Sequence, residues 1–279
     1  MLVNRFDKAN LKCPICQAKT LLEGEKTLCC TGEKKHTYDL SASGYVNLAS
    51  PKQCGGGDTK SAVRARSEFL DGGYYQPIAD KAVELVEKYA GERPTVIDAG
   101  CGEGYYTFQI AKKAELAIGF DISKFAVEAA AKRARRECVD NAVFCVASVY
   151  DMPIFDEMAD AVVNIFAPCV EDEYLRVLKP NGIIIVVQAG REHLMGLKKL
   201  LYASAYENDT RADLPKGVKL VCEETLKYNI EVVGNENIQA LFAMTPYYWR
   251  TSQDDTKKLD GVSSLKTDID IIFSVYKRN

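Results

Sequence analysis

The residues with the most distinctive chemistry are cysteines and a histidine near the N-terminus. Cys13 and Cys16 form a C-x-x-C pair, and Cys29, Cys30 and His36 follow it. Thiolates and imidazoles in two pairs are the ligands that zinc prefers in closed sites. Adjacent residues of a strand point to opposite faces, so only one of Cys29 and Cys30 can join such a site, and Cys30 is nearer the TGEKK turn. The sequence therefore predicts a zinc site of Cys13, Cys16, Cys30 and His36, with Cys29 in place of Cys30 as the alternative ligand. A redox C-x-x-C is the alternative, although no thioredoxin-like βαβ pattern surrounds it.

A second set of chemistry-bearing residues lies in the segment VIDAGCGEGYY, where an apolar run leads into a glycine-rich turn and a helical pattern. Asp98, Gly100, Gly102 and Gly104 give it the spacing D-x-G-x-G-x-G. A dinucleotide-binding fingerprint needs a glycine three residues after the second one, and this chain has a tyrosine there. Such a loop lets the backbone approach a ligand closely, in the crevice outside the carboxyl ends of the strands.

The carboxylates around this loop indicate which ligand it binds. A carboxylate at Asp98 would repel a pyrophosphate but suits an amine. Asp121 ends the next apolar run, where an acid can accept hydrogen bonds from both hydroxyls of a ribose. The implied ligand has a ribose and a cationic amino acid but no phosphate, which fits S-adenosylmethionine.

The two sites require different supporting structures. Residues 1–50 are rich in turns and short strands and form the predicted zinc ribbon, and residues 51–72 contain a flexible linker, rich in glycine, and a helix. Residues 73–279 form the predicted α/β domain, in which Pro77 opens a helix, Ser123 caps another, and Pro180 stops a third that begins near Glu171. Apolar strands that alternate with helices there predict a parallel sheet covered on both faces. Two long segments, 219–233 and 267–278, are expected to form an antiparallel hairpin at its edge.

The charge distribution and the hydropathy of the chain indicate which kinds of partner it can bind. The formal net charge is −3, but residues 1–70 carry an excess of basic residues and the remainder an excess of acidic ones. A basic front indicates an anionic partner for the ribbon. The sequence contains no apolar run of the ~18 residues that a membrane span needs, and its N-terminal segment lacks the apolar core of a signal peptide. We therefore expect a cytoplasmic protein without a membrane partner.

Several short motifs of this sequence occur together in a known protein family. Over almost its full length the chain resembles the bacterial 23S ribosomal RNA (guanine-N1) methyltransferases, in the words CPIC, CCTGEKKHTYD, GYVNL, RARSEFLDGGYYQP, DAGCGEGYYT, IFAPC, REHLMGLK and MTPYYWR. The resemblance implies a zinc ribbon that docks a hairpin of 23S rRNA and a class I (Rossmann-like) methyltransferase domain that uses S-adenosylmethionine. The family usually has three residues between the third cysteine and the histidine, whereas this chain has five after Cys30.

The resemblance also assigns roles to individual residues. It implies that Tyr75, Gly102, Glu103 and His193 line the cofactor pocket, and that Asp151 approaches the adenine, with an ordinary surface acid as the alternative. Phe166, Tyr247, Tyr248 and Trp249 are candidates for stacking on the target base, with packing at the domain edge as the alternative. No residue is marked as the base that removes the guanine N1 proton. The alternative function is a methyltransferase of small molecules or proteins that uses the ribbon for dimerisation, so a homodimer stays open.

Overall fold

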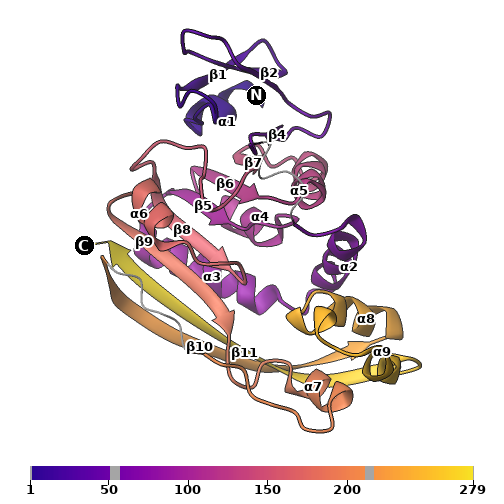
Figure 1. Cartoon of the computed structure of the whole chain (residues 1–279). Coiled ribbons are helices and arrows are strands. Elements are labelled where there is room, and N and C mark those ends of the chain that lie inside the picture. The colour runs from indigo at the N-terminus through magenta and orange to yellow at the C-terminus, as the bar shows by residue number, and fades with distance from the viewer. Residues whose placement is uncertain (1, 51–56, 211–216, 279) are drawn as a thin grey trace.

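The computed structural model describes residues 2–50, 57–210 and 217–278. Its centre is an eight-stranded sheet in the order β10-β11-β9-β8-β5-β6-β7-β4, and a three-stranded sheet, β1-β2-β3, lies at one end of the molecule (Figure 1). The glycine-rich part of the predicted linker falls on residues 51–56, which lie outside the described residues.

Five strands form the parallel middle of the large sheet. They are β5 (Thr95–Ala99), β6 (Leu116–Asp121), β7 (Ala142–Val146), β8 (Ala159–Ile165) and β9 (Leu178–Ala189). Neighbouring residues of β5 face different sides, because Val96 and Ile97 belong to separate apolar clusters. Both faces of the sheet are therefore buried, which confirms the predicted parallel α/β domain.

The helices begin where the sequence provides start signals. Ser123 Oγ accepts a hydrogen bond from the amide of Ala126 and so caps α5, and Pro77 lies in the first turn of α3, where a missing N–H costs nothing. The helices of this part are α2 (Lys60–Asp71), α3 (Gln76–Ala90), α4 (Tyr105–Ala111), α5 (Lys124–Arg136) and α6 (Glu171–Val177).

One predicted helix end is wrong. The sequence predicts that Pro180 stops the helix beginning near Glu171, but α6 already ends at Val177 and Pro180 lies inside β9. The residues before Pro180 are extended, as the steric clash of a proline ring with the preceding residue favours.

The C-terminal part forms the predicted hairpin. Strands β10 (Val218–Val233) and β11 (Ser264–Arg278) pair antiparallel over their length, and β11 also pairs antiparallel with β9. Short helices connect these strands: α7 (Met195–Leu201), α8 (Asn235–Ala243), η1 (Pro246–Trp249), α9 (Gln253–Thr256) and η2 (Lys257–Leu259). None of the helices in the described part of the chain is long and apolar enough to cross a bilayer.

The N-terminal module consists of α1 (Leu2–Lys8), β1 (Thr20–Glu23), β2 (Thr27–Cys30) and β3 (Thr37–Asp39). The segment GYVNL contributes a two-residue strand, β4 (Val46–Asn47), which the sequence assigns to the ribbon. In the structure β4 pairs in parallel with β7 and extends the large sheet instead. The N-terminal module is thus joined to the α/β domain by the strand pairing between β4 and β7.

Candidate functional site

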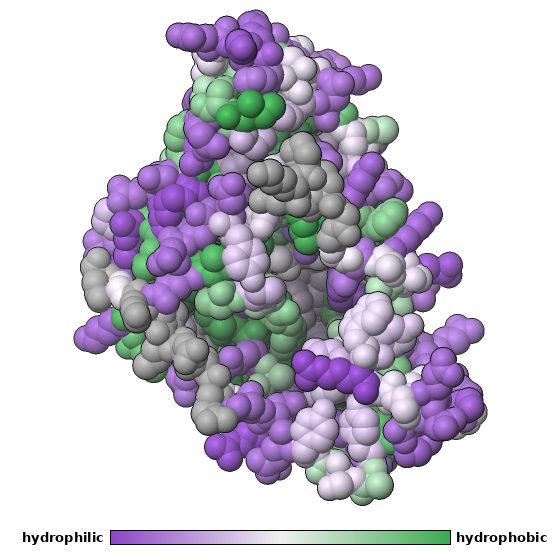
Figure 2. Space-filling view, viewed as in Figure 1, coloured by the Kyte–Doolittle hydropathy of each residue, from purple (hydrophilic) through white to green (hydrophobic). Residues whose placement is uncertain are grey.

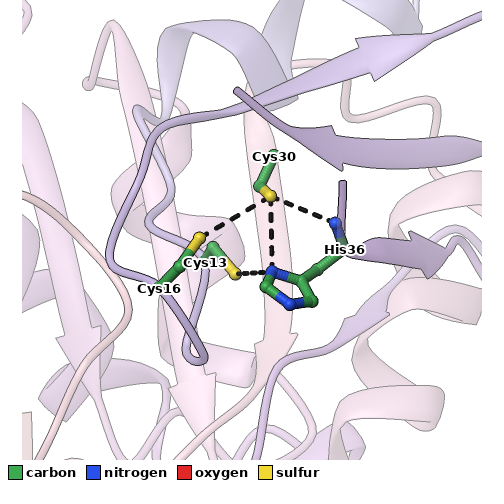
Figure 3. A group of neighbouring side chains, drawn as sticks. All are labelled: Cys13, Cys16, Cys30 and His36. Carbon is green, nitrogen blue, oxygen red and sulfur yellow. Dashed lines mark hydrogen bonds between the residues drawn. The ribbon is translucent and has the colours of Figure 1, made fainter. Parts of the chain in front are cut away.

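The four predicted metal ligands meet at one point of the ribbon (Figure 3). The ligand atoms of Cys13, Cys16, Cys30 and His36 all lie within 4.8 Å of one another. The Sγ atoms of Cys13 and Cys30 are each 3.5 Å from His36 Nδ1, and Cys16 Sγ is 3.7 Å from Cys30 Sγ. Zinc bonds of about 2.3 Å to sulfur and about 2.0–2.1 Å to nitrogen would hold such atoms about 3.6–3.8 Å apart in a tetrahedron. The donor set and its spacing therefore fit zinc.

The two adjacent cysteines have different environments. His36 donates its backbone N–H to Cys30 Sγ at 3.1 Å, and this hydrogen bond lowers the pKa of the Cys30 thiol. Burial and the neighbouring Glu23 carboxyl raise the pKa of the Cys29 thiol. A metal binds the thiolate form, so the cysteine that faces the cluster is also the one whose thiolate is favoured.

The ribbon is docked closely on the α/β domain. Lys12 donates its backbone N–H to the carbonyl of Pro153 at 2.8 Å, and the backbone N–H of Leu48 donates to the carbonyl of Val146 at 2.9 Å. The ribbon side chains Phe6, Leu11, Leu28 and Val46 are buried in the same apolar cluster as one face of the large sheet. The ribbon and the sheet thus share one hydrophobic core.

The glycine loop follows β5 and is shaped by backbone that favours glycine. Gly100, Gly102 and Gly104 have φ values of 86°, 54° and 79°, in the region that L residues rarely adopt. A Cβ on Gly100 would lie 2.5 Å from Ala167 Cβ. The loop can therefore pass close to β8 and direct its amides outward only with glycine at these positions.

Two predicted acids lie at different depths around the loop. Asp121 accepts hydrogen bonds from the backbone N–H groups of Gly102 (3.0 Å) and Ser123 (2.7 Å), which fix its carboxylate beside the loop. Asp98 is buried beneath the loop, where Thr107 Oγ1 donates to it at 2.5 Å, and burial raises its pKa to about 7. Asp98 therefore supports the loop from below in this structure, whereas the sequence places its carboxylate in the crevice.

A cleft of about 2350 Å³ opens above the loop. Figure 2 shows hydrophobic residues near the centre of this face and hydrophilic ones around them. Cofactor-sized pockets measure about 300–1,000 Å³, so the cleft has room for a second molecule. The predicted residues that line it are Tyr75, Gly100, Gly102, Glu103, Asp121, Phe166, His193, Tyr247, Tyr248 and Trp249. Asp98, Gly104 and Asp151 do not line it, and Asp151 is exposed beside lining residues 148–150.

Three aromatic rings from distant segments meet in the cleft. His193 Nε2 lies 3.3 Å from the hydroxyl of Tyr75, and the ring of Phe166 stacks on that of His193 with centroids 6.2 Å apart. The backbone N–H of Asp270 donates to His193 Nδ1 at 3.4 Å, and burial lowers the pKa of His193 to about 4. His193 is thus neutral, and with Nδ1 as acceptor it carries its proton on Nε2.

The wall opposite the glycine loop contains the predicted stacking residues of the TPYYWR segment. Tyr247 is half-buried and donates its hydroxyl to Asn208 Oδ1 at 2.9 Å, whereas Trp249 is 76% exposed. Sequence reasoning missed Lys198, a buried amine that donates to Asn208 Oδ1 at 2.6 Å and to the carbonyl of Tyr206 at 2.8 Å. Its position in the apolar pattern of α7 gives no sign of this role, which is to hold the wall in place.

Sequence reasoning also missed Arg66, which lines the cleft at the glycine loop. Its Nε donates to Glu103 Oε2 at 2.6 Å, and its Nη1 donates to Asp58 Oδ2. Glu103 itself is buried. The charge pattern of RARSEFL is typical of an amphipathic helix, so nothing in it distinguishes Arg66 from Arg64, which points to solvent.

Comparison with known proteins agrees with this geometry. Residues 91–260 match the family model described as "Methyltransferase domain", and residues 11–53 match the model described as "RlmA, N-terminal", a zinc ribbon. The chain is 31% identical to "23S rRNA (guanine(748)-N(1))-methyltransferase" of Streptomyces fradiae, over 88% of each chain. It is 29% identical to "Putative 23S rRNA (guanine-N(1)-)-methyltransferase YxjB" of Bacillus subtilis (strain 168), over 96% of this chain and 98% of that one. The chain therefore belongs to the family of the 23S rRNA (guanine-N1) methyltransferases.

Proposed function

We propose that this protein transfers a methyl group from S-adenosylmethionine to N1 of a guanine in a hairpin of 23S rRNA, in the cytoplasm. The observation that carries the proposal is the pairing, in one chain and over nearly its full length, of the zinc-ribbon cluster with the glycine loop and its cleft. Relatives named for this activity align with 96% and 88% of this chain. A cleft that carries out this reaction must suit both the cofactor and the target guanine in shape and charge.

The charge of the cleft favours bases over phosphates. Among the described residues that line it, aspartates and glutamates outnumber arginines by eight to three, and no lysine is present. Such a lining attracts the sulfonium cofactor and repels the RNA backbone. The target base would therefore enter turned out of its stack, while phosphates contact the basic ribbon.

The aromatic residues would hold the base in line with the reacting methyl group. Bound S-adenosylmethionine supplies an electrophilic methyl on its sulfonium, and catalysis consists mainly of orienting the nucleophile toward it. Phe166 follows β8, lines the cleft and is 44% exposed, so its ring is accessible from the cleft. His193 contacts the hydroxyl of Tyr75 and stacks on Phe166, so it supports both of these rings in the cleft.

The test uses ribosomal RNA from a strain that lacks this gene. Purified protein and methyl-labelled S-adenosylmethionine should yield 1-methylguanosine in 23S rRNA, identified by nucleoside mass spectrometry. Gly100→Val is the matched inactive control, because its side chain would collide with Ala167. Label in protein or small molecules but none in RNA would refute the proposal and favour the alternative in which the ribbon serves dimerisation.

A further inference from the structure

The guanidinium of Arg66 reaches from α2 to the glycine loop, and one of its nitrogens has no hydrogen-bond partner among the described residues. Its Nε and Nη1 contact the carboxylates of Glu103 and Asp58, but Nη2 has no polar partner among the described residues. Nη2 lies 3.2 Å from the position that a Cβ on Gly102 would take, and the side chain is 21% exposed. Its free N–H donors therefore lie directly over the loop, in the cleft.

Among the charged groups around the loop, Arg66 is needed as a partner for the carboxylate of the cofactor's amino-acid moiety. An amino-acid moiety carries an ammonium, which suits the carboxylates of Asp121 and Glu103 at this end of the cleft, and a carboxylate, which those acids repel. Of the other arginines lining the cleft in the described residues, Arg64 is 80% exposed in its side chain and bonded to Glu68, and Arg250 is exposed. His193 is neutral. Arg66 is thus the cation placed to receive an anion at the loop.

We propose that Arg66 is a cofactor-positioning residue whose guanidinium binds the α-carboxylate of S-adenosylmethionine through Nη2. Asp58 and Glu103 hold the guanidinium plane in the required orientation from its other two nitrogens. A guanidinium has five donors in a rigid fork, so it can serve three carboxylates at once. The inference rests on the proposed use of S-adenosylmethionine, and it goes beyond the proposed function by assigning the recognition of one cofactor group.

The experiment measures cofactor binding by calorimetry, without RNA, for two ligands that differ only in the carboxylate. These are S-adenosylmethionine and decarboxylated S-adenosylmethionine. Arg66→Gln should weaken the binding of S-adenosylmethionine by about 10- to 100-fold, the effect of losing a charged hydrogen-bond partner, and should change the decarboxylated ligand less than about 3-fold. Arg64→Gln, two residues away on the same helix and bonded to the exposed Glu68, is the matched control and should leave both affinities unchanged.

A second variant separates carboxylate binding from support of the loop. Arg66→Gln leaves the buried Glu103 without its partner, so Arg66→Gln combined with Glu103→Gln removes both charges and should keep the selective loss for S-adenosylmethionine. Equal weakening of the two ligands in this double variant, or no weakening at all, would overturn the proposal. Because no RNA is present, a chain that failed to methylate rRNA could still show the selective loss, so the two proposals fail separately.

Discussion

Replacing each of the adjacent cysteines by alanine tests the metal site with an internal control. Cys30→Ala should leave less than ~0.1 zinc per chain, whereas Cys29→Ala should retain about one, because a closed structural site uses four ligands. Cys30 Sγ lies 3.5 Å from His36 Nδ1 and 3.7 Å from Cys16 Sγ, whereas Cys29 is outside the cluster. Both side chains are buried, so the two variants lose a thiol of the same size from the same strand.

The structure also predicts how far the effect of zinc loss spreads. Phe6, Leu11 and Leu28 are at most 1% exposed and pack against the large sheet. At about 1.5–3 kcal/mol for each buried side chain, release of the ribbon would remove roughly 5–9 kcal/mol of burial. That is comparable with the whole stability of a typical domain, about 5–15 kcal/mol. Cys30→Ala should therefore lower the main unfolding temperature of the chain as well as the order of the ribbon.

Two measurements together check this prediction: zinc by elemental mass spectrometry and unfolding by scanning calorimetry. Zinc retained in Cys30→Ala but lost from Cys29→Ala would show that the ligand assignment is wrong. A variant that loses zinc while its main transition stays unchanged would refute the shared core and show that the ribbon unfolds independently. Cys29→Ala provides the baseline, with an expected loss of about 1 kcal/mol.

Two further predictions concern the cleft. His193 has a pKa lowered from 6.5 to about 4, so between these values the unfolded chain binds more protons. Its contribution to stability is complete above pH 6.5 and is lost as pH falls toward 4, by up to about 3 kcal/mol. In denaturant unfolding without cofactor, the free energy of unfolding of His193→Gln should therefore depend less on pH between 4 and 6.5 than that of wild type. An unchanged pH dependence would contradict the lowered pKa of His193. Trp249→Ala should leave stability within ~0.5 kcal/mol but weaken RNA binding by about 5- to 150-fold if a base stacks there; filter binding measures this, and unchanged affinity would assign Trp249 to the surface alone.

Local motifs made the two sites predictable. The ligand types at Cys13, Cys16 and His36 and the D-x-G-x-G-x-G spacing each lie within a short segment, so the chemistry of the residues and their order along the chain are sufficient to predict them. Strand alternation predicts that only one of Cys29 and Cys30 can ligate, and nearness to the TGEKK turn favours Cys30, which the structure places in the cluster.

The features that sequence reasoning missed depend on contacts between distant segments. Arg66 and Glu103 are 37 residues apart, and helical periodicity says which face of α2 is polar but not which acid that face meets. The pairing of β4 with β7 depends on two residues, too few for a hydrophobic pattern to set the register. The burial of Asp98 likewise depends on a contact outside the loop, the hydrogen bond from Thr107 of α4, and not on the loop motif itself.

The docking of the ribbon has a consequence for the proposed substrate. Phe166 follows β8, and the ribbon enters the sheet at β4, with β5, β6 and β7 between them. Four strand spacings of about 4.8 Å separate the two positions by roughly 19 Å in the plane of the sheet. Because β4 is hydrogen-bonded to β7, the ribbon cannot move toward the cleft without breaking the sheet edge. An RNA held by the ribbon can therefore present a base at Phe166 only if the RNA itself spans this distance.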